Sequence, residues 1–426
     1  MAVDANVLIY ERVQEEVMAG KGARLALKDG YNNAYSAIID GQVTTLLTGI
    51  VLYMFGSGPI KGFATTLIIG ILTSLFTAIF ITRLIFERSL DNNKTITFVS
   101  PATKNFLRNL HVPFLQYRKK LYIVSIVLIL ISIASLTFKG LNYSVDFKGG
   151  RTYVVRLDKD VRVDDVASAL SAQFGSTPEV KTFGGNNQVR ITTDYRIDEE
   201  GEAVDQEIEQ KLYTGMKQFV GSDVSEEKFL TENRMSSTKV GPTVSDDIKR
   251  DAVLSVFFAL IAIFLYIAVR FRNWQFGLGG LASLAHDVII VIGMFSLFDG
   301  LLPFSLEVDQ AFIAAVLPVV GYSINDTVIV FDRIREYLHL HPKQETMKTF
   351  NEAMNSTLRR TFNTSMTTLV VLIAIFIFGG TSIKGFIFAL LIGIGFGTYS
   401  SVFVATPVAF DALRKWGKKK VETEKK

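Results

Sequence analysis

Long apolar segments alternate with shorter polar ones along most of the chain. A helix needs about 20 apolar residues to cross a bilayer, and lipid-exposed backbone must satisfy its own hydrogen bonds, so each apolar segment is predicted to be a membrane-spanning helix. The first and the seventh reach that length only when their Thr- and Ser-rich starts are included. The segments are 43–55, 60–86, 121–138, 252–269, 276–298, 310–330, 365–378 and 383–409.

Residues 1–12 are also apolar, but polar residues interrupt them and they are too short to span a membrane. They look like the end of a spanning helix whose beginning is absent. The pattern therefore predicts a membrane protein, mainly an α-helical bundle of about nine transmembrane segments with the first one partial.

Basic residues follow every second apolar segment, so they all fall on one side of the membrane if the spans alternate. Because cytoplasmic loops carry an excess of Lys and Arg, this side is expected to be the cytoplasm and residues 139–250 are expected on the outer side. The implied parts are a first membrane region (1–87), a cytoplasmic linker (88–120), one span (121–138), an outer domain (139–250), a second membrane bundle (251–410) and a basic cytoplasmic tail (411–426).

The outer segment alternates between strand-like and helical patterns. Residues 143–157 alternate like a strand, 163–174 have helical spacing, and 203–219 are helical again. Two strands, 180–183 and 188–193, flank a Gly-Gly-Asn-Asn run that is typical of a hairpin. Residues 227–238 are expected to close the sheet. The order βαββαβ predicts a small α+β, ferredoxin-like sandwich.

Composition agrees with a membrane protein, since 49% of the residues are hydrophobic and the mean hydropathy is +0.31. Cysteine is absent, which excludes disulfides and makes thiolate metal sites unexpected. No Walker-type phosphate loop occurs, and four scattered histidines do not indicate a catalytic triad. We therefore expect no enzyme activity, no cofactor and no metal site. The basic tail is expected to lie at the membrane surface, and no nucleic-acid partner is expected.

Two parts of the chain resemble each other. Residues 3–12 (VDANVLIYER) match 324–333 (INDTVIVFDR), and residues 60–63 (IKGF) match 383–386 (IKGF). Both copies run through three helices in the same direction, so this is a parallel repeat, and sites in such proteins lie at the interface of the repeats. The elements upstream of the second copy have no counterpart before the first. We therefore expect the chain to be the C-terminal part of a longer duplicated protein.

Ionisable residues inside apolar segments cost about 2.5–3.5 kcal/mol each on insertion scales and mark candidate functional sites. Asp326 lies near the middle of its segment, Asp4 lies in the matching polar part of the first copy, and Arg360 lies at the cytoplasmic start of the seventh segment. Candidates to support these three residues are Asp40, Asn6, Asn325, Thr327 and Asp287.

Other interpretations stay open for these charges. Asp4 aligns with Asn325 rather than with Asp326, so the sequence does not decide whether the two aspartates face each other. Buried Asp–Arg pairs also link helices by packing alone. Asp40 and Asp287 are candidates for the headgroup region, where a charge needs no function. The favoured interpretation is structural for His286 and a solvated helix end for Glu11-Arg12 and Asp332-Arg333.

Three runs of sequence resemble the bacterial SecD and SecF protein-export membrane proteins. They are residues 1–9 (MAVDANVLI), 145–150 (VDFKGG), and 321–328 (GYSINDTV) with 331–336 (FDRIRE). Up to about residue 87 the chain resembles the C-terminal end of SecD, and from about residue 121 it resembles an entire SecF. The two parts are joined as in fused SecDF proteins.

This resemblance implies a function. SecDF proteins use the proton motive force to help secreted polypeptides finish crossing the inner membrane, together with the SecYEG channel, the SecA motor, YajC and a YidC-type insertase. It also implies that Asp4, Asp326 and Arg360 form a proton relay, that residues 139–250 are periplasmic, and that the C-terminus is cytoplasmic. The first SecD span, its large periplasmic head and two more spans are missing from the sequence.

Two alternatives stay open at this point. A proton-driven efflux pump for small molecules, from the related RND superfamily, shares the duplicated spans and the intramembrane aspartate but carries larger outer domains. A structural factor that scaffolds the export channel would not need the carboxyl group of Asp326.

Overall fold

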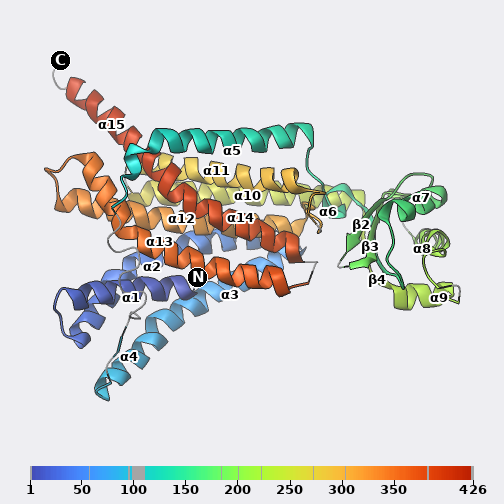
Figure 1. Ribbon diagram of the computed structural model, residues 1–426, viewed down its shortest axis with the longest axis horizontal. Helices are drawn as coiled ribbons and strands as arrows, with labels where there is room; N and C mark the ends of the chain where they lie inside the picture. Colours follow the sequence, from blue (N-terminus) through green and yellow to red (C-terminus); the bar gives the residue numbers. More distant parts are fainter. Residues whose placement is uncertain are drawn as a thin grey trace.

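The computed structural model describes residues 2–56, 58–94, 96–97, 111–183, 185–199, 201–221, 223–271, 273–302, 304–380 and 383–423. A long bundle of helices carries a small sheet domain at one end, and the C-terminal helix projects from the opposite end (Figure 1). Residue 1, part of the predicted linker 88–120 and the last residues of the predicted tail 411–426 lie outside the described residues.

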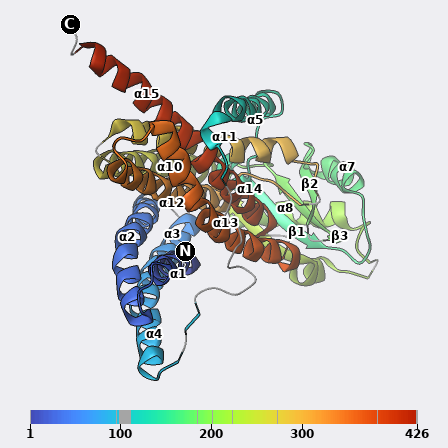
Figure 2. The same cartoon turned by 60° about the vertical axis from the view of Figure 1, so that its left-hand side comes forward.

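The bundle contains two similar sets of helices, and Figure 2 shows the first set gathered on one side. The first set is α1 (Ala2–Met18), α2 (Ala23–Phe55), α3 (Gly58–Phe76), the π-helical turn η1 (Thr77–Ile81) and α4 (Thr82–Asp91). The second set is α12 (Gln310–Leu340), α13 (Thr346–Phe378), α14 (Lys384–Ser400), the π-helical turn η5 (Ser401–Ala405) and α15 (Thr406–Thr423). Between them in sequence are the short turn η2 (Phe114–Gln116), α5 (Arg118–Phe138), α10 (Pro242–Phe271) and α11 (Trp274–Phe298).

Eight helices in the described part of the chain are long and apolar enough to cross a membrane. They cover the eight predicted apolar segments to within two residues at the ends, and α1 is the shorter ninth helix with 17 residues. The predicted helical membrane bundle is thus confirmed. Several helices extend beyond their apolar segments, because a helix satisfies its backbone internally in water as well as in lipid. For example, α2 already begins at Ala23 and α10 at Pro242.

The repeat that the sequence predicts recurs in the structure. Helices α2 and α13 both contain 33 residues, and each is followed by a glycine that caps it. The N–H of Gly56 donates to the carbonyl oxygen of Leu52 at 2.8 Å, and that of Gly379 donates to Ile375 at 2.7 Å. Each set then contains a π-helical turn at the matching place. Because such turns are rare, their matching positions support a duplication.

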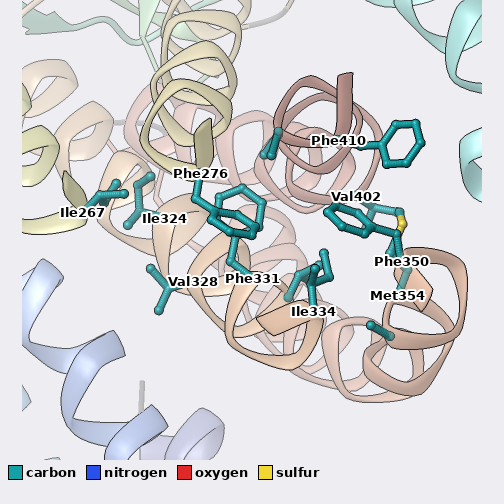
Figure 3. Close-up of a cluster of buried hydrophobic side chains, with 14 of the residues drawn as sticks. Ile267, Phe276, Ile324, Val328, Phe331, Ile334, Phe350, Met354, Val402 and Phe410 are labelled. Atoms are coloured by element: carbon teal, nitrogen blue, oxygen red, sulfur yellow. The ribbon is translucent and has the colours of Figure 1, made fainter. Parts of the chain in front are cut away.

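Helix α12 is the central helix of the bundle, and nearly all of its apolar residues are buried. Figure 3 shows Phe331 of α12 packed on Phe276 of α11, with ring centroids 4.9 Å apart. Phe350 of α13 packs on Phe410 of α15 in the same core, at 5.3 Å. Helix α12 also contacts α2 of the first set, so it packs against helices of both sets.

The sheet domain has the predicted βαββαβ order. Its elements are β1 (Gly150–Arg156), α7 (Val163–Phe174), β2 (Glu179–Phe183), β3 (Gly185–Thr193), α8 (Glu202–Met216), α9 (Glu226–Lys228), the π-helical turn η3 (Phe229–Asn233) and β4 (Arg234–Val240). The strands are antiparallel in the order β2-β3-β1-β4, as the ferredoxin-like prediction requires. Val155 and Ile191 of the sheet pack against Leu170 of α7 and Leu212 of α8 in a separate core.

The prediction of a strand over 143–157 is wrong at its start. Strand β1 begins at Gly150, and the residues before it form the short helix α6 (Val145–Lys148). The chain reverses at two glycines with positive φ, Gly149 at +76° and Gly150 at +127°. A side chain is strained in that region of φ, so only glycine allows this turn without cost. The alternating pattern therefore reports a strand only after the glycine pair.

The segment before β1 is bonded to the start of α12. The N–H of Val308 donates to the carbonyl oxygen of Asn142 at 2.7 Å, and the N–H of Gln310 donates to Asp146 Oδ2 at 3.2 Å. The first N–H groups of a helix have no partner within the helix, so Asp146 caps α12 from the sheet-domain side. The sheet domain and the central helix are thus directly connected.

Candidate functional site between the two repeats

A polar cavity of about 60 Å³ lies between the two sets of helices, at the end of the bundle away from the sheet domain. A single water needs roughly 10–15 Å³ by this measure, so the cavity has room for a few waters. Arg360 lines it from α13 and Glu11 lines it from α1. The other lining residues are Leu8, Arg12, Glu15, Ala37, Ile329, Asp332, Arg333, Glu336, Ser356 and Thr357.

The cavity lies on the interface predicted from the repeat. Helices α1 and α12 each contribute four lining residues at matching positions, 321 residues apart; two such pairs are Leu8 with Ile329 and Glu11 with Asp332. Because equivalent residues face each other, the cavity sits where a pseudo-two-fold axis would relate the repeats. This location agrees with the rule that sites in parallel repeats lie between the copies.

Two ion pairs cross this interface reciprocally. Arg12 Nη2 lies 3.8 Å from Glu336 Oε2, and Arg333 Nη2 lies 3.5 Å from Glu15 Oε1. Each arginine also pairs with the glutamate of its own helix, at 2.8 Å in α1 and 2.9 Å in α12. The expectation that Arg333 ends its helix in solvent is wrong, because only 15% of its side chain is exposed. The four charges join α1 to α12 at the mouth of the cavity.

Asp326 and Arg360 are both buried in the bundle. Asp326 lies mid-way along α12, one turn before Ile329, which lines the cavity. Next to it, the hydroxyl of Thr327 donates to Ser401 Oγ at 2.9 Å in η5. The role of Asp326 and Arg360 in a relay stays a prediction, but their burial in a membrane bundle agrees with a functional charge.

Asn325 of α12 packs closely against α2 of the first repeat. A Cβ added at Gly41 of α2 would lie 1.9 Å from Asn325 Oδ1, so the absence of a side chain at Gly41 makes this contact possible. Asp4 and Asn6 lie in α1, on the same helix as Glu11. The side chain of Asp4 is outside the described residues, so the pairing of Asp4 with Asp326 stays a prediction.

Asp40 belongs to a second charged cluster, which joins α2, α10 and α12. Arg270 Nε donates to Asp40 Oδ2 at 2.9 Å, and the Tyr266 hydroxyl donates to Asp40 Oδ1 at 3.0 Å. Arg270 also bridges to Asp332 Oδ2 at 3.3 Å. Arg270 directly follows the predicted apolar segment 252–269, and the sequence pattern did not indicate this cluster. The position of Arg270 at the end of a long apolar run is the feature that could have indicated it.

The interpretation of Asp287 as a headgroup-level residue is wrong. It lies mid-way along α11 and is fully buried by protein. The hydroxyls of Ser323 and Ser400 donate to its Oδ2 at 2.6 and 2.7 Å, and His286 Nδ1 lies 2.9 Å from its Oδ1. His286 stacks on Tyr399, with ring centroids 5.9 Å apart. These contacts join α11 to α12 and α14, so the Asp287 cluster attaches α11 to the second set of helices.

The start of α12 carries a buried carboxylate outside the membrane span. Asp309 Oδ1 accepts a hydrogen bond from the N–H of Phe312 at 2.7 Å and so caps the helix. Burial, and to a smaller extent the nearby charges of Asp146 and Glu307, raise the pKa of Asp309 to about 6, although the hydrogen bond from Phe312 lowers it. In the part of the chain that the structure describes, no cluster of three or more His, Cys, Asp or Glu side chains is placed to hold a metal.

Comparisons with known proteins agree with this architecture. The family model "Protein export membrane protein SecD/SecF, C-terminal" matches residues 1–90 and 219–415, and the model "SecD/SecF GG Motif" matches residues 134–161. The chain belongs to the SecD/SecF family. The second match contains the glycine pair that turns the chain into β1.

Individual SecF and SecDF proteins are similar along most of the chain. SecF of Rhodothermus marinus is 43% identical over 71% of this chain and 94% of its own length. SecDF of Brucella abortus is 33% identical over 100% of this chain and 53% of its own length, and SecDF of Thermus thermophilus is 35% identical over 97% and 53%. The chain thus spans nearly all of a SecF relative but about half the length of the SecDF relatives.

The fold agrees with solved structures of SecDF. The crystal structure of SecDF from Thermus thermophilus superposes with a TM-score of 0.83 at 32% identity, over 97% of this chain and 53% of that one. SecDF in its super-membrane-facing form gives a TM-score of 0.71 at 30% identity. The membrane bundle and the sheet domain are therefore those of a SecD/SecF protein.

Proposed function

We propose that this chain is an auxiliary part of the Sec protein translocase, in which proton movement between the two repeats promotes a late step of polypeptide export. The observation that carries the proposal is the cavity on the repeat interface, which Arg360 lines and reciprocal charges close. Membership of a protein-export family favours this function over the efflux of small molecules.

The proposed path runs from Asp326 to the cavity. Asp326 is buried in α12, and its helix reaches the cavity one turn later at Ile329. A buried carboxyl group can bind and release a proton, and the waters for which the cavity has room provide a route for that proton. The guanidinium of Arg360 favours the charged form of any carboxylate close to it. Asp4 is proposed as the partner of Asp326 from the first repeat.

The contacts at the start of α12 supply a way to couple this movement to export. Asp146 caps the N-terminus of α12 from the sheet-domain side, and Arg190 of β3 pairs with Glu307 at 3.1 Å just before α12. A shift of α12 therefore reaches the sheet domain directly. One charge that crosses the membrane gains about 2.3 kcal/mol per 100 mV, and an equilibrium between two helix arrangements differs by only a few kcal/mol.

Family resemblance supplies the expected surroundings. We propose that residues 1–87 act as the C-terminal part of SecD and 121–410 as SecF, in the bacterial inner membrane. The sheet domain within 139–250 would face the periplasm and the tail 411–426 the cytoplasm. The proposed partners are the exported unfolded polypeptide, the SecYEG channel and the SecA motor, with YajC and a YidC-type insertase beside them.

The test is to replace Asp326 with Asn in a full-length SecDF protein that contains this chain, and to measure export and proton flux in inverted vesicles. The change keeps the shape of the side chain but removes its titration, so proton-dependent export should fall to the level without the protein. Thr73→Val is a control on the exposed side of α3, where the hydroxyl donates to the carbonyl oxygen of Ile69 in the same helix, and it leaves every carboxylate in place. Wild-type export and flux in the Asp326→Asn protein would leave Asp326 as a packing residue and reject the relay.

A further inference from the structure

A second and larger hollow opens on the outer surface of α10. It is a groove of about 950 Å³ between α10, the segment around α6 and the start of α12. Its walls on α10 are apolar, and Val253 and Phe257 are largely exposed. Two lysines, Lys148 of α6 and Lys249 of α10, line its end next to the sheet domain. The groove is therefore amphipathic, with a charged mouth and an apolar length.

The dimensions of the groove match one leaflet of a bilayer. It follows α10 from Lys249 to Leu260, and eleven residues at about 1.5 Å each give about 16 Å. The hydrocarbon core of a bilayer is about 30 Å thick, so this is about half of it. Residues 246–251 of α10 include five charges, whereas 252–269 include none. The boundary between headgroups and hydrocarbon thus falls at the mouth of the groove.

The charges at the mouth suit a phosphate group. Lys148 forms no ion pair within the part of the chain that the structure describes. Lys249 Nζ donates to Asp246 Oδ1 at 2.8 Å, but 49% and 74% of these side chains are exposed. Exposed pairs of this kind contribute about 0–1 kcal/mol, so a phosphate can replace Asp246 at little cost. A lysine binds phosphate as a compact positive charge.

The apolar walls favour an acyl chain over a polypeptide. An extended peptide would bring backbone N–H and C=O groups into the groove, and each one left without a partner costs several kcal/mol. The part of the groove below its mouth is lined by side chains such as Val256, Leu260 and Ile313, which offer no hydrogen bonds. A hydrocarbon chain has no such groups to satisfy.

We propose that this groove binds one anionic phospholipid from the leaflet next to the sheet domain. Its phosphate lies between Lys148 and Lys249, and one acyl chain follows α10 as far as Leu260. The lipid fills the space between α10 and the segment that attaches the sheet domain to α12. This site does not depend on the proton path.

Binding can be measured by native mass spectrometry of the purified chain, titrated with phosphatidylglycerol or with phosphatidylcholine. The wild-type chain is expected to bind phosphatidylglycerol about tenfold more tightly, a factor that corresponds to about 1.4 kcal/mol. The K148Q/K249Q variant should lose this preference. The Val256→Trp variant, which fills the groove, should weaken both lipids about tenfold. K159Q/K217Q removes two lysines from the sheet domain and should bind like the wild type.

Two results would overturn the proposal. Equal binding by the wild type, K148Q/K249Q and Val256→Trp would mean that only unspecific boundary lipid is present. A photoreactive amino acid at Phe257, in a full-length SecDF protein during export, is expected to cross-link to lipid. Cross-linking to the exported polypeptide in place of lipid would reject a lipid site as well.

Discussion

Charge reversal at the mouth of the cavity tests whether the reciprocal ion pairs hold the two repeats together. Arg333 contacts Glu15 across the interface and Glu336 within its own helix. The change Arg333→Glu turns both attractions into repulsions. We expect α1 to separate from α12 more often, so that the cavity opens towards the end of the bundle away from the sheet domain.

The size of the effect follows from the exposure of the partners. Arg333 is 15% exposed and Glu15 is 48% exposed, so the pair lies between the surface and the interior. A surface pair contributes up to about 1 kcal/mol, so replacing the attraction between Arg333 and Glu15 by a repulsion of similar size favours the open arrangement by about 2 kcal/mol. The contact with Glu336 lies within α12 and does not change when the two helices separate. Since about 1.4 kcal/mol is a factor of ten, the open arrangement should become roughly ten- to thirtyfold more populated.

The absence of cysteine makes the assay direct. A single Ala37→Cys change places a thiol in the cavity wall on α2. Its rate of labelling by an impermeant reagent, measured in inverted vesicles that carry the full-length protein, reports the opening. Arg333→Glu should raise this rate about tenfold or more. The matched control is Arg24→Glu, which breaks the surface pair with Asp91 and should leave the rate unchanged.

A fourfold reversal supplies the decisive comparison. The combination Arg12→Glu, Glu15→Arg, Arg333→Glu and Glu336→Arg inverts every charge of the network but preserves every pair. It should restore slow labelling of the cysteine in the cavity. Rapid labelling in the fourfold variant, or a wild-type rate in Arg333→Glu alone, would show that these ion pairs do not close the cavity.

Three further changes test other contacts through the thermal stability of the purified protein. Arg270→Gln leaves the mostly buried carboxylate of Asp40 without its main partner, so the free energy of unfolding should fall by about 1–3 kcal/mol. Adding Asp40→Asn to this variant should recover most of that loss. An unchanged stability of Arg270→Gln would show that the ion pair does not stabilise the protein. Asp309 has a pKa of about 6 in the folded protein, above its ordinary 3.8, so its contribution to the free energy of unfolding is most favourable below about pH 4 and is lost as the pH rises through 6. Asp309→Asn should therefore reduce the pH dependence of stability by up to about 3 kcal/mol, and an unchanged pH profile would refute this role of Asp309. Gly150→Ala places a side chain at a φ of +127° and 2.8 Å from a carbonyl oxygen of β3, so it should lower the free energy of unfolding by about 1–3 kcal/mol. The control Gly62→Ala, whose added Cβ meets nothing within 4 Å, should be nearly neutral.

Local patterns along the chain were enough to predict most elements of the fold. Apolar length predicted the eight spanning helices, because a segment that long in lipid has no alternative to a helix. Alternation and a glycine-rich hairpin predicted the βαββαβ order of the sheet domain. The pattern failed at Tyr143, where alternation continues into a helical turn and a lone bridge to Val308. The reason is that Gly149 and Gly150, both with positive φ, change the direction of the chain while apolar and polar residues continue to alternate along the sequence.

Charged residues were harder to place, because their surroundings come from other helices. Arg333 and Asp287 have ordinary local sequences, yet one bridges the repeats and the other is enclosed by hydroxyls from α12 and α14. The partners of Arg270 lie 230 and 62 residues away in the sequence. The periodicity of apolar and polar residues along one helix does not indicate which other helix will pack beside it.

The sequence by itself determined what each segment is: which parts span the membrane, which part forms the sheet, and which residues the two repeats share. These properties depend on apolar length, on alternation and on identity at a fixed spacing, all of which are local. Only the tertiary structure decided that the shared residues meet at one cavity and that Arg12 and Arg333 each pair there with a glutamate of the opposite helix. It also decided that Asp146 caps the central helix. Those contacts depend on how separate helices pack, because the distance between two charges in space is independent of their separation along the chain.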